Sequence, residues 1–527
     1  MASSPESTPG AGPGQGPEPT TPTSPPAPAG DAARDPEARR RFSRNVAWNY
    51  ASGLAGIVGL VLLYPVAVQL AGARAYGLWV LAFGATQLLV MTDFGIGDGI
   101  VRRMGALARG GADRGELRRF VGVAVGLFAV LAAVLVLAYL VLVPLYLRTV
   151  PGATDDAGTA RYVVVAGALA LALAVAARGT NAVLWAQDRQ DIERKATFAG
   201  LGVRIAGYGL AAATGTGLLG VVAAEVAGAA VSPIVCSIAV ARRFGAPSLS
   251  PRAWSAGFAE HARGLVRLSL GLFVGSLASL LTFQAPLFLV GTSLGLVAAT
   301  AFGAVMRVYS SARMVDSWTA NPFIHAISST PAPELPGRVR ACAGATLVVG
   351  TGLAVVVSAL APDIVVAWLG ETFLFAAPAL TVVGLGMIAD ALVKPAALVG
   401  NLRGTPLHVS ALHVVVLVVT LVAVSVATTS GNLTAIVLAS TAAPLVCAPL
   451  YLLLARRVLG SSPLPRLGAR WLLAIAAAAA LYAAVYAVGA ALPPWPAVLV
   501  VAAAGLTVLG GGGLVFRRRR RAAAATS

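Results

Sequence analysis

Two arginines and one aspartate lie in residues 295–325, a hydrophobic stretch that also contains several serines, threonines and an asparagine. A guanidinium group offers a planar fork of N–H donors that fits phosphate and carboxylate oxygens, so Arg307 and Arg313 could bind an anion. Asp316 follows Arg313 by one helical turn and can pair with it along a helix. The stretch still keeps an excess positive charge, which lipid would not accept. We expect all three side chains to line a water-filled cavity or an anion site, whereas a neutral structural cluster would need an acid from another helix.

Three more polar side chains in apolar stretches are candidates for the same cavity: Asn49, Asp93 and Gln284. Asn49 belongs to a helical face of polar and small residues, which fits a cavity lining or a close helix–helix contact equally well. The other members of this face are Asn45, Ser52, Gly56 and Gly59. Asp93 precedes the glycine-rich run 95–99, which we interpret as a close approach of two helices because no strand of a nucleotide-binding unit comes before it. Gln284 has only serines and threonines as polar neighbours in residues 268–292, so we expect its contribution to be mild.

The remaining charges within apolar stretches are interpreted as structural. Asp390 and Lys394 are one helical turn apart, in the order that favours an ion pair along a single helix. Arg204 and Glu225 flank a tight turn at 215–217, and at about 1.5 Å of rise per residue their depths differ by about 5 Å. An arginine side chain can bridge that difference. We therefore expect an ion pair across this hairpin.

The elements that carry these residues are predicted to be membrane-spanning helices. Of the 527 residues, 57% are hydrophobic and only 11% are charged, less than half the charged share of a typical soluble domain. The mean hydropathy is +0.81, and apolar runs of about 20 residues or more recur from Val46 to Phe516. This pattern predicts an all-α polytopic membrane protein. It excludes a secreted disulfide scaffold, a cytosolic enzyme and a fibrous protein.

We predict about fourteen transmembrane helices, arranged as two six-helix halves and two additional C-terminal helices. The predicted spans are residues 46–71, 76–101, 120–147, 161–184, 196–215, 218–241, 266–292, 295–325, 341–361, 376–400, 407–428, 433–455, 470–490 and 496–516. The expected organisation is a disordered, proline-rich cytoplasmic tail (1–38), an N-terminal half (39–241), a cytoplasmic linker (242–267), a C-terminal half (268–457), two further helices (458–516) and a basic cytoplasmic tail (517–527).

The distribution of basic residues predicts the topology. The chain has 39 lysines and arginines against 21 acidic residues, and only Arg74, Arg148 and Arg161 fall in the loops expected outside. Basic residues concentrate in cytoplasmic loops of membrane proteins, so we expect a multi-pass protein of the plasma membrane with both termini in the cytoplasm. We also expect these residues to contact membrane lipids rather than nucleic acid, because no nucleic-acid-binding motif accompanies them.

The sequence contains no pattern for a metal or a nucleotide. Its four histidines lack the spacing of metal ligands, and no phosphate-binding loop or soluble ATPase-sized segment is present. We therefore expect no cofactor and no enzymatic activity. A coupling ion, H⁺ or Na⁺, is compatible with the sequence but is not specified by it.

Several short motifs, taken in order, resemble a known family of membrane proteins. They are LAGARAYGLW (70–79), DFGIG (93–97), the pair Arg102–Arg103, AFGAVMRV (301–308), WLGE (368–371) with AAP (376–378), and LVGNLRG (398–404). Their order resembles that in the polysaccharide-transporter (Wzx-like) flippases of the multidrug/oligosaccharidyl-lipid/polysaccharide exporter (MOP) superfamily. MATE exporters and lipid II flippases belong to the same superfamily. The resemblance covers about residues 40–516.

The resemblance implies two helical halves that rock around a central cavity. It implies that the substrate is an oligosaccharide linked to a polyprenyl pyrophosphate, with a glycan polymerase or glycosyltransferases as partners. A MATE-like small-molecule antiporter, a lipid II flippase-like protein and a transport-inactive scaffold are the alternatives. A membrane glycosyltransferase is disfavoured, because the first outside loop, residues 72–75, carries no acid.

Overall fold

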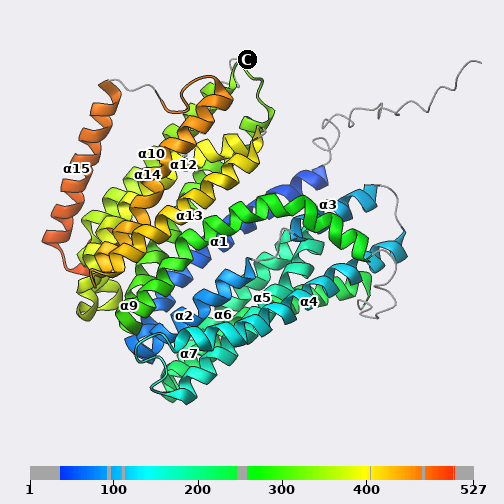
Figure 1. Cartoon of the computed structure of the whole chain (residues 1–527), viewed down its shortest axis with the longest axis horizontal. Helices are drawn as coiled ribbons and strands as arrows, with labels where there is room; N and C mark the ends of the chain where they lie inside the picture. The colour runs from blue at the N-terminus through cyan, green and yellow to red at the C-terminus, as the bar shows by residue number, and fades with distance from the viewer. Residues whose placement is uncertain are drawn as a thin grey trace, which may run out of the picture.

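The computed structural model describes residues 36–91, 96–109, 113–245, 258–403, 405–465, 469–501 and 504. Within these residues every regular element is a helix (Figure 1). Eleven of the helices formed by these residues are long and apolar enough to cross a membrane. The prediction of an all-α polytopic membrane protein is therefore confirmed. The count of fourteen spans stays a prediction, because most of the last expected span, 496–516, lies outside the described residues.

In the described residues, the first bundle consists of seven consecutive helices. They are α1 (Pro36–Ala71), α2 (Ala73–Val90), α3 (Ile96–Arg109), α4 (Arg114–Leu147), α5 (Ala157–Trp185), α6 (Gln190–Thr214) and α7 (Gly217–Phe244). The prediction of a single span over 76–101 is wrong, since α2 ends at Val90 and a separate helix begins at Ile96. Helix α3 carries Arg102, Arg103 and Arg109, and these charges make it an amphipathic helix rather than the end of an apolar one.

Helix α9 (Phe258–Ser329) connects this bundle to the second one. The two spans expected at 266–292 and 295–325 follow each other in α9 without a loop. They meet at a bend at Gly295, whose φ of 81° is accessible to glycine at little steric cost. Before the bend, α9 contacts both bundles, because Leu287 packs over Gly84 of α2 and Gly275 packs against Ser410 in the second bundle.

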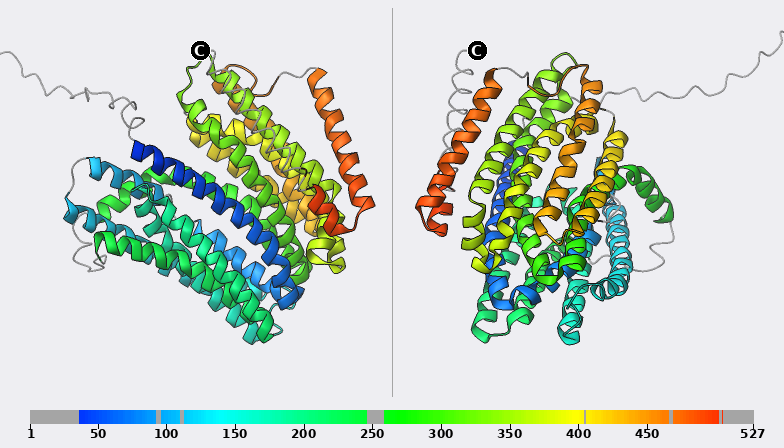
Figure 2. Two further views of the ribbon diagram at one scale, coloured as in Figure 1. Left: turned by 180° about the vertical axis from the view of Figure 1, so that it is seen from behind. Right: turned by 60° about the vertical axis from the view of Figure 1, so that its left-hand side comes forward.

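The second bundle continues from α9 through a further set of helices. These are α10 (Leu335–Ala359), α11 (Ala361–Leu369), the 3₁₀ helix η1 (Glu371–Ala376), α12 (Ala377–Leu402), α13 (Pro406–Thr428) and α14 (Leu433–Leu459). Helix α15 (Ala469–Ala491) packs against α10 and stands at the edge of this bundle (Figure 2). Most of its side chains are exposed, as expected for a helix that faces lipid.

The two bundles are in close contact at one end and diverge toward the other (Figures 1 and 2). At the closed end, Thr300 of α9 donates a 2.7 Å hydrogen bond to the carbonyl of Ala73, and the Tyr64 hydroxyl donates one of 2.7 Å to the carbonyl of Thr300. Gly77 of α2 lies directly against the α9 backbone, so that a Cβ there would come within 2.1 Å of the Leu296 carbonyl oxygen. Small residues and hydrogen bonds thus hold the bundles together at this end.

Loops predicted to share one side of the membrane also share one end of the fold. Arg74 forms an ion pair with Asp155, which joins the first and second loops expected outside. At the opposite end, the Arg403 guanidinium donates to the carbonyls of Ile327 and Thr330, which joins two loops expected inside. The closed end is therefore the one that the arginine distribution assigns to the outside.

Candidate functional site

A cavity of about 600 Å³ lies between α1, α2, α5, α6, α7 and α9. Glycines and alanines of α1, α5, α6 and α7 keep its walls open, while aromatic side chains of α2 and α9 form much of its surface. The polar residues in its lining are Ser52, Tyr64, Tyr76, Thr86, Gln87, Thr197, Arg204, Tyr208, Glu225, Ser232, Gln284, Arg307, Tyr309 and Ser310. The cavity is large enough for part of a sizeable polar ligand.

Arg307 reaches this cavity from α9. Its guanidinium carbon lies 4.6 Å from the centre of the Tyr64 ring, close enough for a cation–π interaction. The rings of Tyr64 and Tyr76 pack edge to face, with their centres 5.2 Å apart. Within the part of the chain that the structure describes, no carboxylate lies at ion-pair distance from Arg307. The Arg307 cation is thus supported by aromatic rings and remains available to an anion.

The ion pair expected across the α6–α7 hairpin is present. Arg204 Nε lies 3.5 Å from an oxygen of Glu225, and Tyr208 donates a 2.7 Å hydrogen bond to the other oxygen. All three side chains line the cavity, so the purely structural interpretation of this pair was incomplete. The charged residues that line the cavity are Arg204, Glu225 and Arg307, and their charges sum to one positive charge.

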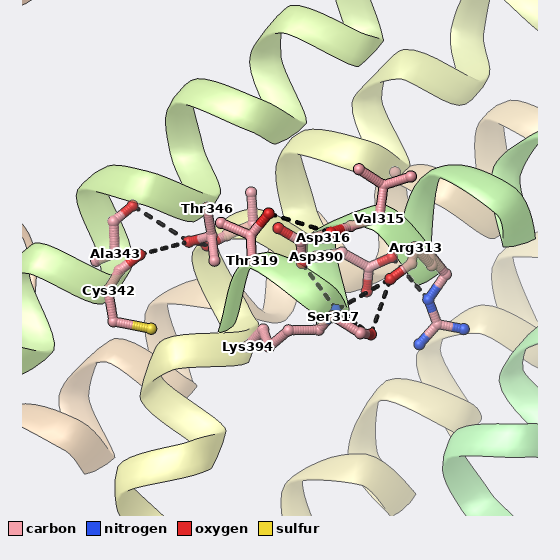
Figure 3. Close-up of polar contacts among 12 residues, drawn as sticks. Arg313, Val315, Asp316, Ser317, Thr319, Cys342, Ala343, Thr346, Asp390 and Lys394 are labelled. Atoms are coloured by element: carbon pink, nitrogen blue, oxygen red, sulfur yellow. Dashed lines mark hydrogen bonds and ion pairs between the residues drawn. The ribbon is translucent and has the colours of Figure 1, made fainter. Parts of the chain in front are cut away.

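The interpretation of Arg313 and Asp316 changes with the structure. Figure 3 shows both residues of α9 facing α12. Arg313 pairs with Asp390 at 2.9 Å, and Asp316 pairs with Lys394 at 2.8 Å. Both expected pairings along a single helix, Arg313 with Asp316 and Asp390 with Lys394, are therefore replaced by pairs between helices. The acid that a neutral cluster requires comes from α12.

This four-charge cluster is reinforced by neighbouring groups. Lys394 also donates to the Ser317 hydroxyl at 2.9 Å, and the Tyr309 hydroxyl donates to Asp390 at 2.8 Å. The Arg313 guanidinium lies 3.7 Å from the centre of the Phe283 ring. Neither Arg313 nor Asp316 is among the residues that line the cavity. The cluster is neutral and joins α9 to α12, beside the cavity rather than in it.

The other sequence-derived candidates fall into three groups. Gln284 lines the cavity together with Arg307. Asn49 lies in α1, on a part of the helix whose side chains are not described, and Asp93 lies outside the described residues. On the polar face that includes Asn49, Ser52, Gly56 and Gly59 line the cavity, and Gly59 also accommodates Leu201 of α6. That face therefore lines the cavity and also packs closely against another helix, which were the two alternatives that the sequence left open.

Several lining residues were missed by reasoning from sequence, and tyrosines are prominent among them. Tyr64, Tyr76 and Tyr208 lie in apolar stretches, where an aromatic side chain is most often part of the core. A buried tyrosine needs a hydrogen-bond partner for its hydroxyl group, and Tyr64 and Tyr208 both have one. The need to satisfy a hydroxyl group within an apolar stretch is the signal that could have identified these tyrosines as candidates.

Among the described residues, no group of histidine, cysteine, aspartate and glutamate side chains is arranged to hold a metal ion.

No protein-family profile matches the chain, and no curated protein matches it. Solved structures do match. A multidrug-resistance MATE transporter of the MOP superfamily in an inward-facing conformation superimposes with a TM-score of 0.61 at 14% identity, over 79% of this chain and 94% of the transporter. The lipid II flippase MurJ in an inward closed conformation gives a TM-score of 0.59 at 11% identity, over 83% and 96% of the two chains. A MATE transporter of the MOP superfamily in an outward-facing conformation gives 0.52 at 15% identity, over 79% and 96%.

These similarities extend over nearly the whole of each solved chain. At identities of 11–15% they establish the fold. The chain therefore has the fold of these MATE transporters and of MurJ.

Proposed function

We propose that this protein is a membrane flippase. It would move an oligosaccharide linked to a polyprenyl pyrophosphate, a precursor of cell-surface polysaccharide, from the inner to the outer leaflet by alternating access. The fold supports a transporter rather than an enzyme, and Arg307 is the observation that supports an anionic substrate. A guanidinium group at membrane depth without a carboxylate partner is stable only beside water, an aromatic ring or an anion.

The charge of the cavity separates the main alternatives. A MATE-like antiporter of cationic compounds needs an acidic cavity, yet the only acid among the described lining residues is Glu225, which already contacts Arg204 and Tyr208. A lipid II flippase-like protein also moves a diphosphate-linked saccharide, so the two flippase hypotheses share the same head-group chemistry. A transport-inactive scaffold gives no role to an unpaired arginine in a cavity. We expect a glycan polymerase or glycosyltransferases to act on either side of the transport step.

The decisive variant is Arg307→Ala. We expect it to lower flipping of a fluorescent saccharide on a polyprenyl diphosphate about 10- to 100-fold in proteoliposomes, because hydrogen bonds to a charged group are worth about 1.5–3 kcal/mol. Arg307→Lys keeps the charge but loses the bidentate fork, so intermediate activity is expected. Rates are normalised to the amount of folded protein in the vesicles.

Arg338→Ala is the matched control, since Arg338 is an exposed arginine of α10 that does not line the cavity. Ethidium serves as a cationic probe in the same vesicles. Wild-type rates in the Arg307→Ala variant, or transport of ethidium in preference to the lipid-linked saccharide, would contradict the proposed function.

A further inference from the structure

Two guanidinium groups, not one, line the cavity. Arg307 enters from α9 and Arg204 from α6, on the wall that the first bundle contributes. Tyr76 of α2 lies in the same lining. Two cationic side chains from different parts of the fold therefore share one cavity.

Arg204 is held in place from one side only. Its Nε contacts Glu225, which is itself fixed by the Tyr208 hydroxyl. Gly228 of α7 makes room for the arginine stem, since a Cβ there would lie 2.3 Å from Arg204 Cγ. In the described part of the chain, Glu225 is the only carboxylate at ion-pair distance from Arg204, and none of the guanidinium nitrogens, the buried Nε included, forms a hydrogen bond. About a third of the side chain is exposed, at 34%.

The geometry points to Arg204 as the second arm of the anion site, so that the cavity recognises a head group with two phosphates rather than one. This inference rests on the proposed function. One phosphate of a diphosphate diester binds Arg307, and the other binds the terminal nitrogens of Arg204. Glu225 acts as a positioning residue, because its negative charge lies on the Nε side of Arg204 and leaves the two terminal nitrogens open. A monophosphate can occupy only one of the two arms.

A substrate held by both arms also bridges the two sides of the cavity. Arg204 belongs to the first bundle, whereas Arg307 follows the bend in α9 and lies on the helix that the Arg313–Asp390 and Lys394–Asp316 pairs attach to α12. A diphosphate between them joins two bodies that diverge at the inner end. Head-group recognition is thereby connected to closure around the substrate.

The test compares two probes that have the same polyprenyl chain and the same labelled sugar, joined through one phosphate or through two. The key variant is the double substitution Arg204→Gln with Glu225→Gln. It removes the arm and leaves the net charge of the cavity unchanged, and no charge is left unpaired. The ratio of initial flipping rates for the two probes, at concentrations well below saturation, is insensitive to the amount of active protein.

We expect the wild-type protein to prefer the diphosphate probe by about tenfold or more, as one additional charge-assisted contact provides. The double variant should lose this preference because its diphosphate rate falls, while its monophosphate rate is retained. The matched control is Lys394→Gln with Asp316→Asn, which removes a neutral ion pair outside the cavity and should keep the wild-type ratio. A wild-type ratio in the Arg204→Gln, Glu225→Gln protein, or no preference in the wild-type protein, would overturn the inference.

Arg307→Gln distinguishes this inference from the function on which it rests. If Arg307→Gln abolishes transport of both probes and the double variant keeps the wild-type ratio, only the second arm is wrong. If Arg307→Gln transports both probes normally, or if the wild-type protein moves neither, the proposed function and the inference fail together.

Inorganic pyrophosphate tests whether a free diphosphate occupies the same arms. If pyrophosphate inhibits flipping by the wild-type protein but not by the double variant, a free diphosphate also binds both arginines. No inhibition of the wild-type protein would restrict them to the lipid-attached head group. Equal inhibition of the two proteins would contradict the proposal.

Discussion

At the scale of single residues, arginines with similar sequence environments have different roles. Arg307 and Arg313 lie on the same helix, yet the first rests on Tyr64 in the cavity and the second pairs with Asp390. Spacing along a helix indicates which side chains could meet on that helix, but not which acids a neighbouring helix contributes. The candidate Arg307 could therefore be found in the sequence, whereas the pairing of Arg313 required the position of α12.

The cluster on α9 and α12 makes a prediction about stability. Asp316 is almost completely buried, with 4% of its side chain exposed, and Lys394 is its ion-pair partner. We expect Lys394→Met to destabilise the protein by about 3–5 kcal/mol, because it leaves a buried carboxylate without a partner. Adding Asp316→Leu should restore most of that loss. Thermal unfolding in detergent measures both effects.

The same two variants distinguish a structural role of this ion pair from a role in transport. Flipping per folded molecule should be close to wild type in the Lys394→Met, Asp316→Leu protein, since neither residue lines the cavity. A double variant as unstable as Lys394→Met alone would argue against the ion pair.

At the scale of helices, apolar runs located most of the elements correctly. They did not show that α2 ends at Val90, nor that the two spans on either side of Gly295 meet at a kink without an intervening loop. Mean hydropathy averages over a window of residues, so a short break and a single left-handed glycine leave little trace in it. The tyrosines of α1 and α2 were missed for a different reason, because an aromatic residue in an apolar stretch is most often part of the core.

The contact between α2 and α9 predicts how the closed end can be opened. A Cβ at Gly77 would overlap the Leu296 carbonyl, so Gly77→Ala should push the two helices apart at a cost of about 1–3 kcal/mol to the closed state. A cysteine in place of Thr300, which is fully buried at this contact, should then react faster with a membrane-impermeant maleimide. Gly202→Ala is the control, because a Cβ there meets open space. Equal labelling in the two backgrounds would show that this contact does not hold the end closed.

The start of α5 predicts a dependence of stability on pH. Hydrogen bonds from the Thr159 side chain and backbone lower the pKa of Asp156, the N-cap residue of this helix, below its ordinary value. Because the pKa is lower in the folded state, the stabilisation is fully present above the unfolded-state pKa and is lost as the pH falls through the folded-state pKa.

Asp156→Asn keeps an oxygen acceptor but cannot ionise in this range. We therefore expect the difference in melting temperature between wild type and Asp156→Asn to shrink as the pH is lowered into the acidic range. A difference that stays constant with pH would contradict the role of the ionised cap.

At the scale of the whole molecule, the distribution of arginines and the fold assign the same loops to the same ends. The Arg74–Asp155 pair lies at one end and the contacts of Arg403 at the other. We predict that a reporter fused after Gly158 is outside and that one fused after Ser462 is inside. Alkaline phosphatase and green fluorescent protein fusions measure the two positions. If the first reporter is inside and the second is outside, the closed end faces the cytoplasm instead.

One tyrosine connects the proposed anion site with the closed end. The ring of Tyr64 supports Arg307, and its hydroxyl donates a hydrogen bond to the carbonyl of Thr300 on the opposite bundle. Under the proposed function, occupancy of this site and separation of the bundles are thermodynamically linked, and each changes the other's equilibrium by the same factor. A substitution of Tyr64 that slows dissociation of the substrate will therefore also change the equilibrium for separation of the bundles. Affinity and turnover cannot be tuned independently at Tyr64.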